Sequence, residues 1–298
     1  MSLPSFDDLA RRADKRSSPV PVVAAGGADA TVIAALSTAS RRGWVRPLLT
    51  GPLADMERTA AAEGISLEGF ELLEDERDSA VRAVGCIREG RAALLMKGQI
   101  PTPALMKGIL DRENGLRTGR AIAQIVLMEI LRDGRRFLMT DTGVMVAPTL
   151  DQKVDLLQSV LAVARKLGVE APRIAVMSAT EKPTDAMPDT HEAVQLSQRA
   201  AAGEFGPCEV QGPLSFDLAY ASEAGERKRI EGTVTGRADA MLFPNLLAAN
   251  LTVKGIMYTA DCRFGGILCG ASCPVVFMSR ADSVETRLNS LAYALALI

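Results

Sequence analysis

Short apolar runs alternate along the first hundred residues with longer stretches whose apolar positions recur at helical spacing. The first run, Val20–Ala25, ends at Gly26-Gly27, and a helical pattern follows over 28–42. Similar units follow, with strands expected at 45–50, 70–73 and 92–96 and helices at 52–63 and 75–89. Repeated strand–helix units of this kind predict a parallel sheet with right-handed crossovers.

The pattern changes after residue 120. Two strand-like stretches, 122–130 and 136–140, flank Asp133-Gly134, which predicts an antiparallel hairpin. Later elements are expected as helices at 151–167, 190–202, 246–258 and 282–297, and as strands at 173–178, 208–211, 238–243 and 275–278. The length of 298 residues suits about two domains. We therefore expect an α/β protein whose second domain is built on a different sheet.

Charge and composition narrow the class of protein. Lys and Arg number 34 and Asp and Glu number 36, a net charge of −2, which argues against a nucleic-acid or anionic-membrane binder. No apolar run reaches the roughly 20 residues of a membrane span, and the N-terminus has no apolar signal core. The five cysteines are an odd number in a long chain, so we expect free thiols and a cytoplasmic protein.

The segment with the most candidate chemistry begins with Gly265-Gly266 and ends at the start of the last predicted helix. It is expected to run from a glycine-rich loop through a buried strand to that helix. A strand end that meets a helix N-terminus suits an anion, and Ser279 and Arg280 add hydrogen-bond donors there. Alternatively, Asp282 and Glu285 form a capping box that only stabilises the helix.

A second candidate follows the strand expected at 92–96. Lys97-Gly98, with Thr102 at the next helix start, could bind a phosphate or a carboxylate. The alternative is a solvated lysine and a helix-capping threonine. Arg117 could line the same cleft or be an ordinary surface residue.

A third candidate lies near the end of the strand expected at 238–243. Asn250 and Lys254 are four residues apart and share a helix face, where a buried pair could hold a phosphate. Otherwise Lys254 is an ordinary exposed lysine.

Several other activities lack their sequence signals. The chain contains neither Gly-x-Gly-x-x-Gly nor Gly-x4-Gly-Lys-Ser/Thr, which disfavours a Rossmann dehydrogenase and a P-loop kinase. His191 is the one histidine, and Cys269-x3-Cys273 lacks a second cysteine pair at zinc-site spacing. We therefore expect no metal site.

Several short motifs occur in an order that is familiar from one family. The chain resembles the phosphate acetyltransferase/phosphate butyryltransferase family from about Val20 to its C-terminus. The motifs that carry the resemblance are Leu95-Met-Lys97-Gly98-x3-Thr102, Gly115-Leu-Arg117-Thr-Gly119, Asp141-Thr-Gly143, Ala238-Asp239-x4-Pro244-Asn245, Asn250-x3-Lys254 and Pro274-Val-Val-x2-Ser279-Arg280-Ala-Asp282-Ser283.

The resemblance implies a fold and an activity. The fold is similar to that of the isocitrate/isopropylmalate dehydrogenases, with mostly parallel sheets flanked by helices and the active site in the interdomain cleft. The first domain would comprise 1–137 plus 270–298, and the second 138–269. The activity would be reversible acyl exchange between coenzyme A and phosphate in a homodimer. Acyl-CoA, phosphate and acyl phosphate would be the substrates, with no metal and no tightly bound cofactor.

The resemblance also assigns roles to individual residues. Ser279 and Arg280 match the active-site Ser-Arg pair of the family, and Lys97, Gly98 and Thr102 match its cleft loop. Arg117, Asn250 and Lys254 complete the predicted substrate-binding set.

Two positions depart from the family pattern. The acetyltransferase branch carries an aspartate seven residues after the active-site serine, but this chain has Thr286 there. The butyryltransferase-like branch also lacks that aspartate, so this departure favours the butyryltransferase-like branch. The general base therefore stays open, with Asp282 as first choice and Glu285 as second. Ala249 replaces the usual glycine before Asn250, which could alter a close backbone approach to a ligand.

The function expected from these observations is transfer of an acetyl or butyryl group by direct attack of the coenzyme A thiol on the acyl phosphate. Two alternatives remain at this stage. One is an acyl-phosphate synthase that uses acyl-carrier protein, and the other is a non-catalytic homologue that binds coenzyme A or phosphate.

Overall fold

The structure is a computed structural model that describes residues 2–75, 77–279 and 281–298. The chain forms two compact units. The first unit comprises Phe6–Arg120 and Phe264–Ile298, and the second comprises residues 2–5 and Ala121–Arg263. The C-terminal segment therefore belongs with the N-terminal α/β repeats.

The sheet of the first unit is parallel except at one strand. Its order is β3-β2-β1-β4-β11-β10, and β10 alone of these runs antiparallel to its neighbour β11. The strands are β1 (Val20–Ala25), β2 (Val45–Gly51), β3 (Glu71–Glu74), β4 (Leu94–Lys97), β10 (Cys262–Cys269) and β11 (Val275–Val276). The order places the carboxyl ends of β1, β4 and β11 side by side.

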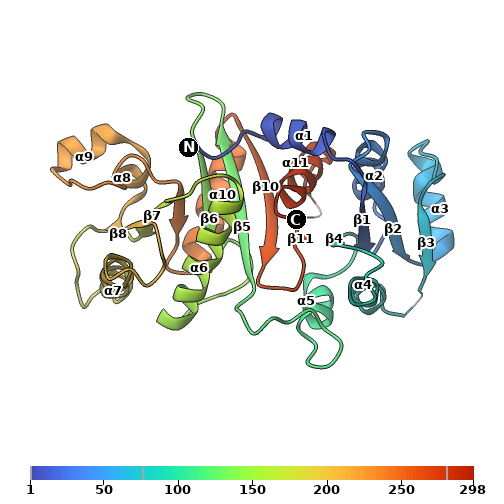
Figure 1. Cartoon of the computed structure of the whole chain (residues 1–298), viewed down its shortest axis with the longest axis horizontal. Coiled ribbons are helices and arrows are strands. Elements are labelled where there is room, and N and C mark those ends of the chain that lie inside the picture. The colour runs from blue at the N-terminus through green and yellow to red at the C-terminus, as the bar shows by residue number, and fades with distance from the viewer. Residues whose placement is uncertain (1, 76, 280) are drawn as a thin grey trace. The chain divides into compact units, whose positions relative to one another are not determined.

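Helices cover both faces of this sheet. Four successive residues of β1, Val22–Ala25, have no exposed surface, and successive strand side chains point to opposite faces. Helix α11 packs on α1 and α2, whereas α4 packs on α5 (Figure 1). The helices are α1 (Phe6–Asp14), α2 (Ala30–Arg41), α3 (Leu53–Ala62), α4 (Ser79–Arg88), α5 (Thr102–Leu110) and α11 (Val284–Leu295).

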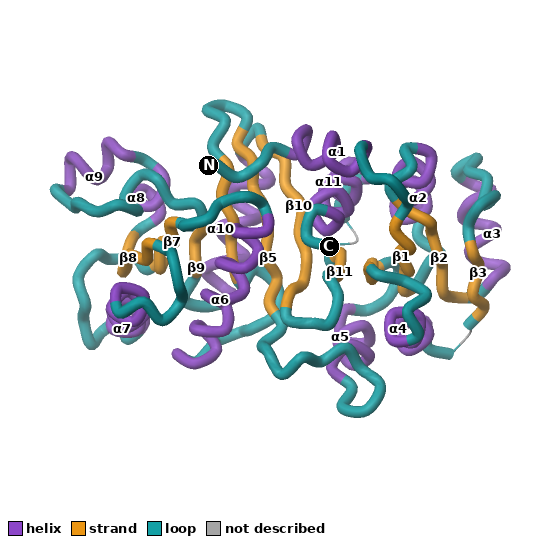
Figure 2. Tube along the Cα trace, viewed as in Figure 1, coloured by secondary structure: helices purple, strands orange, loops and turns teal. Residues whose placement is uncertain are grey.

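The second unit combines the predicted hairpin with parallel strands. Figure 2 distinguishes its strands from its helices and loops by colour. Its strands are β5 (Ala123–Ile130), β6 (Arg136–Thr140), β7 (Arg173–Met177), β8 (Glu209–Leu214) and β9 (Ala240–Leu242), in the order β5-β6-β9-β7-β8. Strands β5 and β6 are antiparallel, which confirms the hairpin, and the others are parallel. The helices are α6 (Leu150–Lys166), α7 (Asp189–Ala201), α8 (Phe216–Tyr220), α9 (Ser222–Lys228) and α10 (Leu246–Thr259).

The structure differs from the sequence prediction most clearly at β10. Gly265 and Gly266 were expected in a loop, but both lie inside this strand. A Cβ atom on Gly265 would lie 3.0 Å from the backbone nitrogen of Ser290 and 3.2 Å from the ring of Phe6. The glycine therefore permits close packing of α11 and α1 on the strand and does not form a turn.

The division into units also differs in its boundaries from the predicted ranges. The predicted boundary after residue 137 falls within β6, and the one after residue 269 falls at the end of β10. The contacts of the described residues keep the whole β5–β6 hairpin in the second unit. Helices α1, α8 and α9 were not predicted, whereas α5 begins at Thr102, where a helix start was expected.

Candidate active site

Three loops gather at one edge of the first unit's sheet. They follow β1, β4 and β11, which are neighbours in the sheet. Lys97 ends β4 and Gly98 begins the loop that follows it, whereas the loop after β11 contains Ser279. The carboxyl edge of a parallel sheet is where α/β proteins bind ligands. The structure thus brings the first and second predicted candidates together.

Ser279 is exposed, and hydrogen bonds with the residues that follow it fix its loop. Its backbone N–H donates to Oδ2 of Asp282 at 2.6 Å, and its carbonyl accepts from the N–H of Asp282 at 3.2 Å. The N–H of Ala281 donates to Ser279 Oγ at 3.3 Å. Accepting this bond does not use the hydroxyl proton, so Oγ can still donate to a ligand. Arg280 lies outside the described residues.

The last helix is capped differently from the prediction. Ser283 is the N-cap, and its Oγ accepts from the N–H of Thr286 at 3.2 Å. The predicted capping box of Asp282 and Glu285 is therefore wrong, because the Asp282 carboxylate is turned toward Ser279 instead. Thr286 is buried, and its Oγ1 lies 3.0 Å from Ser283 Oγ.

Lys97 and Gly98 are both buried at the end of β4. Lys97 Nζ donates to the carbonyl of Gly98 at 3.3 Å. Gly98 donates its N–H to the carbonyl of Ala25 at 2.8 Å, and a Cβ at this position would lie 2.1 Å from the carbonyl oxygen of Gly26. Only glycine fits such an approach of two backbones. Thr102 is exposed and begins α5, after Pro101 as N-cap.

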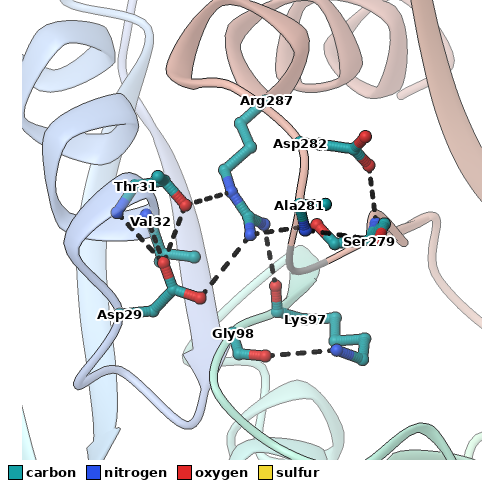
Figure 3. A network of polar contacts seen from close by, with 9 residues as sticks. All are labelled: Asp29, Thr31, Val32, Lys97, Gly98, Ser279, Ala281, Asp282 and Arg287. Carbon is teal, nitrogen blue, oxygen red and sulfur yellow. Dashed lines mark hydrogen bonds and ion pairs between the residues drawn. The ribbon is translucent and has the colours of Figure 1, made fainter. Parts of the chain in front are cut away.

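Sequence reasoning missed the residue that links these loops, Arg287. Its side chain is 1% exposed. Its Nε donates to Thr31 Oγ1 at 2.7 Å, and its Nη2 lies 3.5 Å from Oδ2 of Asp29 (Figure 3). Nη1 donates to the Lys97 carbonyl at 3.4 Å and Nη2 to the Ser279 carbonyl at 3.3 Å. The one sequence signal was a charged residue on the apolar face of the last helix, three positions after Val284.

Burial and charge act in opposite directions on this guanidinium. Burial lowers the pKa of Arg287, whereas the carboxylates of Asp29 and Asp282 raise it. Asp29 is itself the N-cap of α2, and its Oδ1 accepts from the N–H of Thr31 at 3.0 Å and of Val32 at 3.1 Å. The start of α2 and the start of α11 are therefore joined through one ion pair.

Arg117 lies at the other end of β11. Its backbone pairs with Ala271, and Thr118 Oγ1 donates to the carbonyl of Gly270 at 2.6 Å. These contacts come before β11 begins, whereas Ser279 follows its carboxyl end. A role for the exposed Arg117 side chain in substrate binding stays a prediction.

In the second unit, a loop after β6 is organised around one carboxylate. Asp141 is buried, and its Oδ1 accepts from the N–H groups of Gln124 and Gly143, both at 3.0 Å, and of Val144 at 3.2 Å. Its Oδ2 accepts from the N–H of Met145 at 2.7 Å. Burial raises the pKa of Asp141, and these backbone bonds oppose the shift.

Asn250 contacts this loop and is half-buried, whereas Lys254 is exposed. The side-chain amide of half-buried Asn250 donates to the carbonyl of Thr142 at 3.1 Å. Lys254, one turn further along α10, is exposed. The methyl group of Ala249 is fully buried, so it packs in the core of the unit.

Two further features bear on the class of site. Across the described ranges, no three His, Cys, Asp or Glu side chains gather where they could hold a metal ion. No helix in the same ranges is both long and apolar enough to cross a lipid bilayer.

Comparisons with known proteins place the chain in one family. The family model described as Phosphate acetyl/butaryl transferase matches residues 73–295. A phosphate butyryltransferase of Clostridium acetobutylicum is 34% identical over 292 residues, covering 97% of each chain. A phosphate acetyltransferase of Thermotoga maritima is 35% identical over 288 residues, covering 96% of this chain and 97% of that protein.

A solved structure agrees with this assignment. The crystal structure of a branched-chain phosphotransacylase from Enterococcus faecalis V583 superposes with a TM-score of 0.83 at 27% identity, covering 93% of this chain and 98% of that one. The fold, the ordered motifs and the near-complete coverage lead to the same conclusion. The chain belongs to the phosphate acetyl/butyryl transferase family.

Proposed function

We propose that the chain catalyses reversible transfer of a short acyl group, acetyl or butyryl, between coenzyme A and inorganic phosphate. The names of its relatives support this, since they are phosphate butyryltransferases and phosphate acetyltransferases. The observation that carries the proposal is the braced, exposed Ser279 beside Lys97-Gly98 at the carboxyl edge of the sheet. The comparisons favour neither the acyl-carrier-protein-dependent synthase nor the non-catalytic homologue.

The chemistry proposed is direct attack of sulfur on the acyl phosphate. The coenzyme A thiol gives its proton to a base, and the sulfur forms a bond to the carbonyl carbon. The bond from that carbon to the phosphate oxygen then breaks, and phosphate leaves with the electron pair. In reverse, a phosphate oxygen attacks the thioester and the sulfur leaves. Because the thiol is itself the nucleophile, coenzyme A serves as substrate and no tightly bound cofactor is needed.

Residues of the first unit are proposed for the reacting groups. Ser279 Oγ donates to the oxyanion that forms at the carbonyl, a contact whose loss typically costs about 10²–10³ in rate. Arg280 and Lys97 are the cations proposed for the phosphate. Asp282 is proposed to take the thiol proton, with the exposed Glu285 as second choice.

Other predicted residues are proposed to bind the rest of the substrates. Gly98 and Thr102 belong to the loop after β4, whereas Asn250 and Lys254 lie on α10 of the second unit. Arg117 belongs to the same proposal.

We further propose a cytoplasmic homodimer. All five cysteines are free thiols, as in proteins of reducing compartments. Helix α10 supports self-association, because Leu247, Leu251 and Tyr258 are 68%, 62% and 79% exposed and recur along one helix face.

The proposed activity is tested by measuring phosphate-dependent release of coenzyme A from acetyl-, propionyl- and butyryl-CoA. We expect turnover with at least one of the three, at a kcat/KM within the usual enzyme range of about 10⁴–10⁸ M⁻¹s⁻¹. Palmitoyl-CoA and an acylated carrier protein are the comparison donors. Absence of turnover with every short donor would overturn the proposal, and activity with long acyl donors alone would favour the synthase.

A further inference from the structure

Arg287 contacts all three of the loops that form the candidate active site. It reaches Asp29 and Thr31 at the start of α2, which follows β1, the Lys97 carbonyl at the end of β4 and the Ser279 carbonyl after β11 (Figure 3). These four contacts use all three nitrogens of one guanidinium, and Nη2 contacts both Asp29 and the Ser279 carbonyl. Since that group is planar and its donors are fixed in a fork, it sets the spacing between the carbonyl groups that it binds.

The spacing that matters chemically is between Ser279 and Lys97. The Ser279 carbonyl belongs to the same residue as the proposed oxyanion donor, and the Lys97 carbonyl belongs to the proposed phosphate-binding lysine. The pairing between β11 and β4 stops short of both residues, because its register ends at Val276 and Met96, although Lys97 still pairs with Ala25 of β1. The guanidinium of Arg287 therefore joins the end of β4 to the Ser279 loop, beyond the last residues that pair between β4 and β11.

Stability alone does not account for a charged residue at this position. Arg287 is 1% exposed on a helix whose other core residues are Leu291, Leu295 and their neighbours. Replacing a buried ion pair with apolar residues of similar volume is often neutral or stabilising. A buried guanidinium stays charged at neutral pH, so its burial has an energetic cost that a leucine would avoid. The loop contacts supply a reason for its presence.

We propose that Arg287 is a positioning residue for acyl transfer, holding the Ser279 loop and the Lys97 loop in the arrangement that the reaction requires. This inference rests on the proposed function. Asp29 has a supporting part, because its carboxylate neutralises the guanidinium while it caps α2. The substrate is not contacted by Arg287 itself, whose nitrogens are occupied by the loops.

The test compares Arg287→Gln and Arg287→Lys with the wild type in steady-state assays, at a temperature well below each melting point. Both variants should fold and show a kcat at least tenfold lower, with KM for acyl-CoA within about threefold of the wild-type value. Lysine should restore little of the kcat, because one ammonium group cannot reproduce the planar fork that holds three loops.

Arg42→Gln is the matched control. Arg42 also forms a two-point contact with a carboxylate, from Nε and Nη2 to Asp14 at 3.1 and 2.8 Å, but at the opposite end of α2. Its loss should leave kcat unchanged. If the Arg287 variants do not fold, Thr31→Val decides. It removes the contact to Nε, together with the hydrogen bond from Thr31 Oγ1 to Asp29 Oδ1 at 2.7 Å, and keeps the guanidinium. We expect kcat to fall at least threefold, and an unchanged kcat would overturn the positioning role.

The outcomes separate the two proposals. A wild-type protein that does not turn over short acyl-CoA would overturn the proposed function and this inference with it. An active wild type together with folded Arg287 variants of unchanged kcat would overturn only the positioning role. Full recovery of kcat in Arg287→Lys would also overturn it, because charge pairing with Asp29 would then be sufficient.

Discussion

At the scale of single residues, two serines four positions apart should separate catalysis from helix capping. Ser279 is exposed with its hydroxyl able to donate, whereas Ser283 is the N-cap of α11. Ser279→Ala should lower kcat by about 10²–10³, as expected for loss of one oxyanion donor, with little change in melting temperature. Ser283→Ala should cost about 1 kcal/mol of unfolding free energy and leave kcat unchanged.

Both variants are measured by steady-state kinetics and by denaturant unfolding. Full activity in Ser279→Ala would remove this residue from the oxyanion site. If folded Ser283→Ala lost much of its kcat, the capped start of α11, and not the Ser279 hydroxyl alone, would control the rate.

The residues around Ser279 show what a sequence can and cannot assign. The position of Ser279 after the last parallel strand was predictable, because a short apolar run ended there and a helical pattern began. The partner of Asp282 was not, since an aspartate three positions before a glutamate fits a capping box equally well. Arg287 was missed because its partners, Thr31 and Lys97, are 256 and 190 residues away along the chain.

At the scale of elements, the packing of the loops after β1 and β4 depends on Gly98. Gly98→Ala places a methyl group 2.1 Å from the carbonyl oxygen of Gly26, so one backbone must move. We expect a loss of about 1–3 kcal/mol in unfolding free energy, typical of overpacking, together with a lower kcat because Lys97 moves with the loop.

Gly108→Ala is the matched control for that substitution. Gly108 lies inside α5, and a Cβ there would meet Ala80 at 3.5 Å, an ordinary contact. Alanine is the better helix former, so this variant should be neutral or up to about 1 kcal/mol more stable. Urea titrations of both variants measure the difference. Equal stability of the two variants would contradict the close backbone approach at Gly98.

Elements were predictable where the hydrophobic period was unambiguous. Strand β1 and helix α2 were expected at nearly their observed bounds, because a continuous apolar run and a 3.6-residue pattern follow one another there. Strand β10 was not expected at Gly265 and Gly266, because glycine usually marks a turn and its use for close packing depends on α11, which is distant in sequence. Helices α8 and α9 are five and seven residues long, too short for a periodic signal.

At the scale of the whole molecule, the alternation of strands and helices was enough to indicate an α/β fold. It did not show to which unit the C-terminal segment belongs. The return of Phe264–Ile298 to the first unit depends on contacts such as that of Arg287 with Thr31. Periodicity carries no information about such distant partners. The family resemblance supplied that expectation, because it implied a first domain completed by the C-terminal segment.

The proposed homodimer gives the prediction at this largest scale. Leu247, Leu251 and Tyr258 form an exposed apolar face on α10, a helix of which only Ala249 and Val253 are buried among its 14 residues. A symmetric dimer buries the same face twice, so a single substitution counts in both chains. Leu251→Asp should therefore weaken association by about 3 kcal/mol or more, at least a hundredfold in Kd.

Sedimentation velocity at micromolar concentration measures the outcome. The wild type should have about twice the chain mass of 31.6 kDa, and Leu251→Asp should sediment as a single chain. Val81→Asp is the control, because Val81 is also 55% exposed but lies on α4 in the first unit, and it should remain dimeric. A monomeric wild type would rule out the dimer, and a dimeric Leu251→Asp would mean that the chains associate through another surface. The exposed apolar face lies on the same helix as Asn250. If the monomeric Leu251→Asp variant also had a lower kcat, dimer formation would be linked to the proposed substrate-binding role of Asn250.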